Sequence, residues 1–323
     1  MAGILTTFCL CFLFSTAQGD DINNIYQGIG LPEGPAWDSR RHEMLAADAS
    51  AGELWRVPGI AGSRECVITH RRGNAGLAWH VDGGSVISGK NVAWKHGDAS
   101  ALLVNVDLDG DAARFNDPTT SVEGRVYVGS IDFNSRGEGK SQYGSLFLTD
   151  VDGAARRVAS DLRQNNGLGF SPDGRFLFHV DSLPALLRRY EFNVDGDLQG
   201  EEVFYAWSDG IPDGLEVAVD GLTWVALDHV GSKGSVTVLG PEDVERMRIE
   251  IPSARVRSLC SGGAQLNSIL VTMGGDITGE AMDGFVAEMK FEAFGMEVPC
   301  ARVRPRRVGL GHKRRWNETN ERI

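Results

Sequence analysis

The chain has 323 residues, of which 42% are hydrophobic and 24% charged, and its formal net charge at pH 7 is −12. These values describe an ordinary soluble globular protein with enough apolar residues for a sizeable core. Because phosphate binding draws mainly on Lys and Arg, a body this acidic excludes nucleic acid as an expected partner.

The first segment, residues 1–19, holds an apolar run from Ile4 to Phe14 followed by small residues near Ala17 and Gly19. It resembles a secretory signal peptide, although no Lys or Arg precedes the run. The run is too short to span a bilayer, and nothing comparable follows it, so we expect no membrane span. The protein is then expected to be secreted or periplasmic, and cytoplasmic if the segment is not a signal.

Six similar units follow, each with an apolar strand, an Asp-Gly type turn, a second β-rich strand, and a third and often a fourth strand. They begin near Pro35, Gly76, Asn116, Asn166, Asp213 and Leu259, and the last ends at Phe291. A period of roughly 40 to 50 residues is the range of four-stranded propeller blades. Alternating apolar and polar residues oppose a helical solenoid. The sequence therefore predicts an all-β fold, a six-bladed β-propeller over residues 20–301, which we expect to be a monomer.

Several units open on a residue with a side-chain oxygen. The clearest are Glu33-Gly34, Asn166-Gly167 and Asp213-Gly214, with Asn116-Asp117 at a fourth opening. Asn-Gly and Asp-Gly pairs are first of all turn formers, and we assign Asp82, Asp173 and Asp220 to ordinary turns. The openings differ because they precede the strand nearest the propeller axis, where their side chains can converge. Such oxygen ligands suit a hard divalent cation such as calcium, magnesium or manganese.

Other catalytic patterns are missing from the sequence. The seven histidines lack the helical spacing of a zinc protease, no Gly-x-Ser-x-Gly stretch occurs, and no phosphate-binding Gly-rich loop is present. Cys66, Cys260 and Cys300 follow the predicted signal, an odd number that gives no disulfide framework. We expect Cys260 to be a buried free thiol, while Cys66 and Cys300 can pair if the chain ends meet.

At this point the chain resembles a known family, the calcium-dependent lactonases of the senescence marker protein, regucalcin and gluconolactonase group, over about Gly30 to Phe291. The motifs that carry the resemblance are Glu33-Gly34-Pro35-Ala36-Trp37, Arg114-Phe115-Asn116-Asp117, Asn166-Gly167-Leu168, Ser171-Pro172-Asp173-Gly174, Asp181-Ser182, Pro212-Asp213-Gly214-Leu215 and Gly262-Gly263-Ala264. The resemblance implies a six-bladed propeller that holds one divalent cation, calcium first, with zinc, manganese or magnesium as alternatives.

The family pattern also implies roles for single residues. Its metal ligands correspond to Glu33, Asn116, Asn166 and Asp213, and its substrate-contacting residues in the third blade to Arg114 and Asn116. Arg257 departs from the pattern, because relatives usually carry a small or uncharged residue there. If Arg257 faces the axis, the pocket favours an anionic substrate.

The mechanism expected from this arrangement is hydrolysis of a sugar-type or related lactone, with Asp213 as the first candidate for general base and Asp117 as the second. Arg114 is expected to orient substrate hydroxyls or stabilise the oxyanion. Two alternatives stay open, a phosphotriester or aryl-ester hydrolase using the same site and a non-catalytic calcium-binding protein. The basic tail, residues 302–323, is expected to be a solvated, disordered segment rather than an anion-binding arm.

Overall fold

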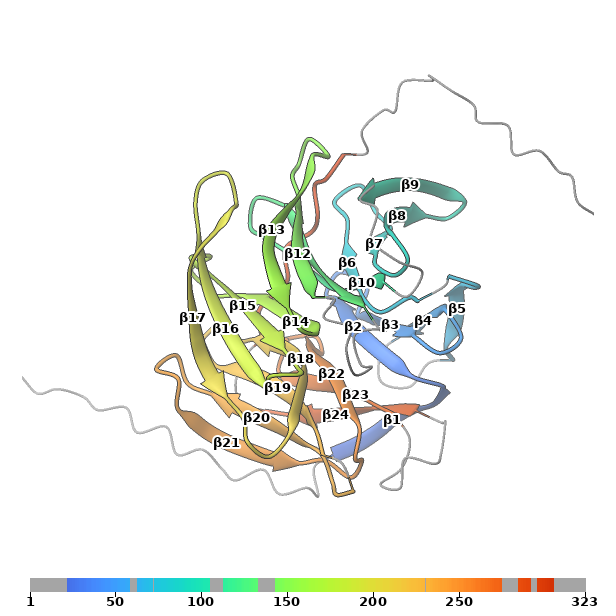
Figure 1. The fold of residues 1–323 in the computed structure, drawn as a ribbon. Helices are drawn as coiled ribbons and strands as arrows, with labels where there is room; N and C mark the ends of the chain where they lie inside the picture. The colour runs from blue at the N-terminus through green and yellow to red at the C-terminus, as the bar shows by residue number, and fades with distance from the viewer. Residues whose placement is uncertain are drawn as a thin grey trace, which may run out of the picture.

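The computed structural model describes residues 22–58, 63–71, 73–104, 113–132, 143–229, 231–274, 284–291 and 295–304. These residues form six four-stranded antiparallel sheets arranged as a six-bladed β-propeller, as predicted. Figure 1 shows the first strand of each blade toward the middle of the molecule and the last strands at its periphery. No helix occurs among the described residues, and therefore no membrane-spanning helix is found there.

The first three blades follow the chain from the inside outward. Blade one contains β2 (Pro32–Asp38), β3 (Glu43–Asp48), β4 (Glu53–Pro58) and β5 (Glu65–Ile68). Blade two contains β6 (Leu77–Trp79), β7 (Ser85–Ile87), β8 (Val92–His96) and β9 (Ala99–Val104). Blade three contains β10 (Ala113–Thr120), β11 (Val126–Asp132), β12 (Gly144–Thr149) and β13 (Ala155–Leu162).

The next two blades repeat this order. Blade four contains β14 (Asn165–Phe170), β15 (Phe176–Asp181), β16 (Leu186–Phe192) and β17 (Leu198–Ala206). Blade five contains β18 (Ile211–Val217), β19 (Thr223–Asp228), β20 (Ser235–Leu239) and β21 (Glu245–Glu250).

Blade six joins both ends of the propeller. It contains β22 (Val256–Gly262), β23 (Ser268–Met273) and β24 (Gly284–Lys290), and its outer strand is β1 (Ile22–Ile29) from the start of the described chain. β1 pairs antiparallel with β24, with Ile22 opposite Met289. The sequence pattern predicted that this unit begins at Leu259, but it did not predict that the fourth strand comes from the N-terminal side of the chain.

The core consists of apolar layers between neighbouring blades, because each sheet packs its two faces against the next sheets. Tyr127 and Leu148 of blade three pack with Phe170 and Tyr190 of blade four in one such layer. The rings of Tyr127 and Phe170 meet edge to face at 5.4 Å. The buried Tyr127 hydroxyl donates a 2.9 Å hydrogen bond to the Gly196 carbonyl, so its one polar group is satisfied in the layer.

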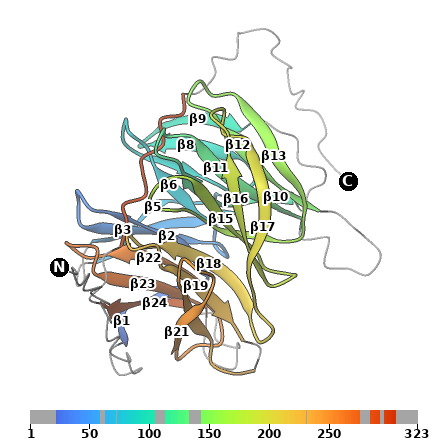
Figure 2. The same ribbon diagram turned by 90° about the vertical axis from the view of Figure 1, so that its left-hand side faces the viewer.

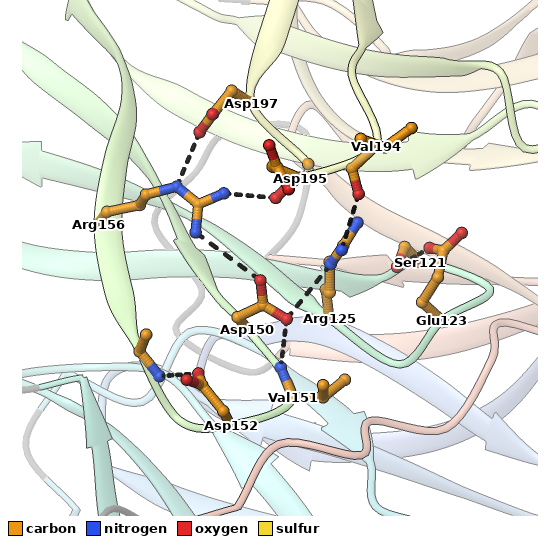
Figure 3. Close-up of polar contacts among 12 residues, drawn as sticks. Ser121, Glu123, Arg125, Asp150, Val151, Asp152, Arg156, Val194, Asp195 and Asp197 are labelled. Atoms are coloured by element: carbon orange, nitrogen blue, oxygen red, sulfur yellow. Dashed lines mark hydrogen bonds and ion pairs between the residues drawn. The ribbon is translucent and has the colours of Figure 1, made fainter.

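A network of ion pairs also joins blades three and four, at the turn between β16 and β17 (Figure 3). Arg156 Nε lies 2.7 Å from Asp197 Oδ1, and the same guanidinium reaches Asp150 and the Asp195 carbonyl. Arg125 pairs with Asp150 and donates to the Val194 carbonyl. Because these groups are partly exposed, the network positions the two blades more than it stabilises them.

After blade six, residues 295–304 cross the propeller as an extended strap, which Figure 2 shows in red along one side of the ring. Gly295 bridges to Ala218 of blade five, and Ala301 bridges to His80 of blade two. The imidazole of buried His80 accepts from the Asp82 N–H at Nδ1 and so donates from Nε2 to the Val303 carbonyl. The first three residues of the predicted tail, 302–304, therefore pack on the propeller.

Two predicted segments lie wholly or partly outside these residues. The predicted signal segment, residues 1–19, and the rest of the tail, residues 305–323, lie outside the described part of the chain. Cys66, Cys260 and Cys300 are all free thiols, so Cys66 and Cys300 do not pair, and Cys260 is buried as expected.

Candidate active site

The predicted site residues lie in the inner strands at places where the strands bulge. Asn166 and Gly167 of β14 together face a single residue of β15, because Asn165 pairs with Asp181 and Leu168 pairs with His179. The register of β10 shifts in the same way at Asn116 and Asp117, and that of β18 at Asp213 and Gly214. In β2 the shift comes directly after Glu33. A bulge bends the strand and re-aims a side chain. The pairs that were expected to precede the inner strands are therefore bulges inside them.

Glycine follows three of the four site positions, Glu33, Asn166 and Asp213, because the inner strands touch there. A Cβ added to Gly167 would lie 2.5 Å from the Leu215 nitrogen of blade five. One added to Gly214 would lie 2.6 Å from Ser258 Cα of blade six. One added to Gly34 would lie 2.5 Å from Gly76 Cα of blade two. Glycine therefore permits the backbones to close around the axis, which brings the preceding side chains together.

Two amides from adjacent blades meet in the site. The Asn116 side chain donates from Nδ2 to Asn166 Oδ1 and, over 2.9 Å, to the Asn165 carbonyl. Asn166 is 4% exposed, and its own Nδ2 donates a 2.6 Å hydrogen bond to Ser182 Oγ. Ser182 thus fixes which way the Asn166 oxygen points. Two of the four predicted ligands are in direct contact.

The carboxylates gather around the guanidinium of Arg257. Its Nη1 lies 3.2 Å from Asp213 Oδ2 and 3.0 Å from Asp228 Oδ2, and its Nε lies 3.9 Å from Glu33 Oε1. Arg257 sits where the register of β22 shifts against β23, between Val256 and Ser258. The structure thus places Arg257 at the axis, and its guanidinium links blades one, five and six.

The negative charges in this cluster raise one another's pKa. Burial, and then the charges of Asp213, Asp117 and Asp228, hold the pKa of Glu33 well above its usual range, against the opposing effect of Arg257. Burial and the charge of Asp213 raise the pKa of Asp117 to about 8. Burial raises that of Asp228 to about 7, although Arg257 opposes the rise. Arg257, together with Arg255, which acts on Asp228, does not supply enough positive charge to balance the four carboxyl groups.

The donor set fits a hard divalent cation. Glu33 and Asp213 supply carboxylate oxygens, Asn116 and Asn166 can supply amide oxygens, and the surplus negative charge would be neutralised by a cation. Across the described residues, no group of three or more His, Cys, Asp or Glu side chains is arranged to hold a metal ion. A site here would therefore depend on the two amides as well as on the carboxylates.

The third-blade arginine, Arg114, reaches the connection between blades one and two. A Cβ added to Gly73, in the connection before β6, would lie 2.8 Å from Arg114 Cδ. The Arg114 side chain therefore extends from β10 over the neighbouring blade two. Its contact with substrate stays a prediction.

Asp228 was not among the predicted site residues, although a repeat position marks it. Asp48, Asp181 and Asp228 each end the second strand of their blade. Asp48 accepts hydrogen bonds from the Gly30 and Leu31 backbone, and Asp181 from Arg163 and Gln164, just before the inner strand of the same blade. Asp228 instead pairs with Arg257 of the next blade. The comparison of the three positions could have identified it.

Below these residues the ring encloses a cavity of about 310 Å³. It lies along the far halves of the inner strands, where Trp37, Trp79 and Glu216 line it, and the strap contributes Met296 and Cys300. Of the predicted site residues only Asp117 lines it, so Asp117 separates the carboxylate cluster from the cavity. Burial raises the pKa of Glu216 to about 7.

Comparison with known proteins gives the same family as the motifs. A model of the SMP-30/Gluconolactonase/LRE-like region matches residues 31–275. Pentonolactonase XacC of Haloferax volcanii is 28% identical over 268 residues, 79% of this chain and 85% of that protein. The 6-deoxy-6-sulfogluconolactonase of Pseudomonas putida is 28% identical over 249 residues, 75% and 82% of the two chains. The solved structure of a calcium-binding regucalcin from Agrobacterium tumefaciens has the same fold, with a TM-score of 0.74 at 21% identity over 90% of this chain and 98% of that one.

Proposed function

The chain belongs to the SMP-30/gluconolactonase/LRE-like family, and from this membership we propose that it is a divalent-metal-dependent hydrolase that opens a sugar-type or related lactone. Relatives named as lactonases, among them a pentonolactonase and a sulfogluconolactonase, support a lactone-hydrolysing enzyme. The observation that carries the proposal is the bulged inner strands, which bring side-chain oxygens of four blades toward one axis.

Glu33, Asn116, Asn166 and Asp213 would hold the cation, and a bound divalent cation supplies Lewis-acid polarisation of the lactone carbonyl. Asn166 presents its oxygen in a fixed direction, because Ser182 holds the amide nitrogen. The ligand set contains no thiol and no imidazole, which favours calcium, magnesium or manganese over softer metals. Calcium is the first choice, with zinc as a further possibility to test.

Asp213 is the first candidate for the general base that accepts the proton of the attacking water. Its side chain is 10% exposed and accepts a 3.2 Å hydrogen bond from Arg257. Asp117 is the second candidate, but a pKa of about 8 leaves it mostly protonated near neutral pH unless additional positive charge lies nearby. Arg114 would orient substrate hydroxyls or stabilise the oxyanion.

A panel of aldonolactones, aryl esters and phosphotriesters, each assayed with calcium, magnesium, manganese and zinc, tests the proposal. Turnover of lactones that depends on added metal supports it. Turnover confined to phosphotriesters or aryl esters would identify the second kind of hydrolase. Tight calcium binding with no turnover of any substrate would identify a non-catalytic calcium-binding protein.

We also propose that the protein is exported, on the strength of the apolar segment between Ile4 and Phe14. N-terminal sequencing of the protein recovered from outside the cytoplasm tests this. A mature N-terminus close to Ala17 or Gly19 is the expected result, and an intact Met1 on a cytoplasmic protein would contradict it.

A further inference from the structure

We propose that Arg257 is a built-in competitor of the cation, a tethered positive charge that holds Glu33 and Asp213 when no cation is bound and must leave them when one enters. The inference rests on the proposed function, because it concerns the same ligand set. It adds a residue that sets how tightly the site takes its cation.

The competition follows from shared oxygens. Arg257 donates a 3.2 Å hydrogen bond from Nη1 to Asp213 Oδ2, and its Nε lies 3.9 Å from Glu33 Oε1. Calcium binds carboxylate oxygens at about 2.3–2.6 Å, so a cation between the two carboxylates would need the side that the guanidinium faces. Two positive charges at such a short distance also repel each other strongly in a site shielded from water.

The present position of Arg257 is also incompletely satisfied. Its Nε has no hydrogen-bond partner, although it is buried and only 3.9 Å from the nearest Glu33 oxygen. A buried donor without a partner costs free energy. The guanidinium is thus attracted by the charge of Glu33 without a good hydrogen bond to it, which makes this contact the easier one to give up.

Asp228 provides the place to which the guanidinium can withdraw. It lies 3.0 Å from Nη1 of Arg257 and is not among the four predicted cation ligands. A small rotation of the Arg257 side chain toward Asp228 would keep the charge paired while it frees the Glu33 and Asp213 oxygens. Asp48 and Asp181, at the same position of their blades, bind backbone amides just before the inner strand of their own blade, whereas Asp228 faces a charged side chain of the next blade, which supports such a function.

The experiment measures cation affinity, not activity, on the full chain stripped with chelator. Isothermal titration with Ca²⁺ and Mn²⁺ compares the wild type with Arg257→Gln, Arg257→Lys and the control Arg246→Gln. Arg246 pairs with Glu242 at the outside of blade five, so its variant loses the same charge away from the axis. We expect Arg257→Gln to bind about tenfold tighter, while Arg257→Lys and Arg246→Gln stay within about threefold of the wild type.

Each outcome decides the matter. If the wild type binds a cation and opens lactones but Arg257→Gln binds no tighter, the competition is wrong and the proposed function stands. If neither protein binds a cation and no lactone is opened, both proposals fail. Should Arg257→Gln not fold, structures of the wild type with and without Ca²⁺ replace it. A cation bound by Glu33 and Asp213 with Arg257 still in contact with both would overturn the inference.

Discussion

The Nη1 atom of Arg257 lies 3.2 Å from Oδ2 of Asp213, across the boundary between blades six and five. The carboxylate proposed as general base is therefore paired with a side chain that the sequence suggested only as a substrate contact. A residue of blade six thus contacts the proposed base in blade five.

Asp213→Asn removes the proposed base and one ligand charge while it keeps the shape of the side chain. We expect the turnover number for lactones to fall at least about 100-fold, the lower end of what general-base catalysis contributes. Steady-state kinetics at saturating metal measure it, with circular dichroism to show that the fold is intact. Activity within tenfold of the wild type would remove Asp213 from the mechanism.

Asn166→Ala removes an amide ligand, and Ser182→Ala removes only the group that orients it. Loss of such an orienting partner typically weakens metal binding about 10- to 100-fold, so Ser182→Ala should weaken cation binding by at least about tenfold and Asn166→Ala by more. Calorimetric titration gives both affinities. Asn193→Ala, in a turn of the same blade where the side chain accepts from two backbone amides, is the control. Equal affinities in Asn166→Ala and the control would contradict the ligand assignment.

Removal of the cation should stop lactone hydrolysis and lower the stability of the propeller. At a cation concentration about 100 times the dissociation constant, binding stabilises the folded state by about 2.7 kcal/mol, which chelator would remove. Thermal unfolding with EDTA, and again after calcium is restored, measures this alongside activity. Full activity in excess chelator would be incompatible with a metal-dependent enzyme.

Glu216 should make the protein less stable as pH rises. Its folded pKa of about 7 exceeds the ordinary value of 4.5, so the fold favours the protonated form, and the benefit is lost as pH rises from about 4.5 to 7. Glu216→Gln should therefore raise the free energy of unfolding at pH 8 by about 3 kcal/mol and change it little at pH 4. Urea unfolding at both pH values measures the effect.

The exposed Glu297, at the same cavity, provides the control variant Glu297→Gln. It also removes one carboxylate, but not a buried one. If both variants show the same pH dependence as the wild type, burial of Glu216 does not govern it.

Arg156→Met breaks the network between blades three and four shown in Figure 3. Its hydrogen bond lowers the pKa of Asp197, so this stabilisation is present above pH 3.8 and is lost as pH falls through the lower folded pKa. Because Asp197 is 47% exposed, we expect a loss of at most about 1 kcal/mol at neutral pH, smaller still in high salt. Arg175→Met, on an exposed turn of blade four, is the control in chemical denaturation. A loss that is unchanged in high salt would point to packing.

The family and the six-bladed fold were predictable because the sequence pattern that indicates both of them repeats along the chain. Apolar strands and turn pairs recur in the units, the Glu33, Asn166 and Asp213 motifs recur at one position of several of them, and the family match confirms the resemblance drawn from them. What the sequence could not reveal depends on contacts between blades. The strand partner of β24 follows from ring closure, and the pairing of Arg257 with Asp228 follows from the packing of blade five against blade six.

The conformation of the site pairs was also beyond local rules. Asn166-Gly167 has the composition of a tight turn, and turn statistics favour that interpretation. In the ring, however, Gly167 is pressed against the backbone of blade five, and a strand with a bulge is the conformation that permits it. Packing between blades decided the local structure here.

The closure of blade six by β1 has a consequence for biosynthesis. Glu33 emerges early from the ribosome and Arg257 late, and the two are brought face to face only when the last strand has annealed to the first. An incomplete or truncated chain would therefore contain the predicted cation ligands of its early blades but bind a cation only weakly. Cation binding should therefore indicate that the propeller ring has closed. Proteolysis that removes β1 or β24 should abolish cation binding although all the predicted ligands remain.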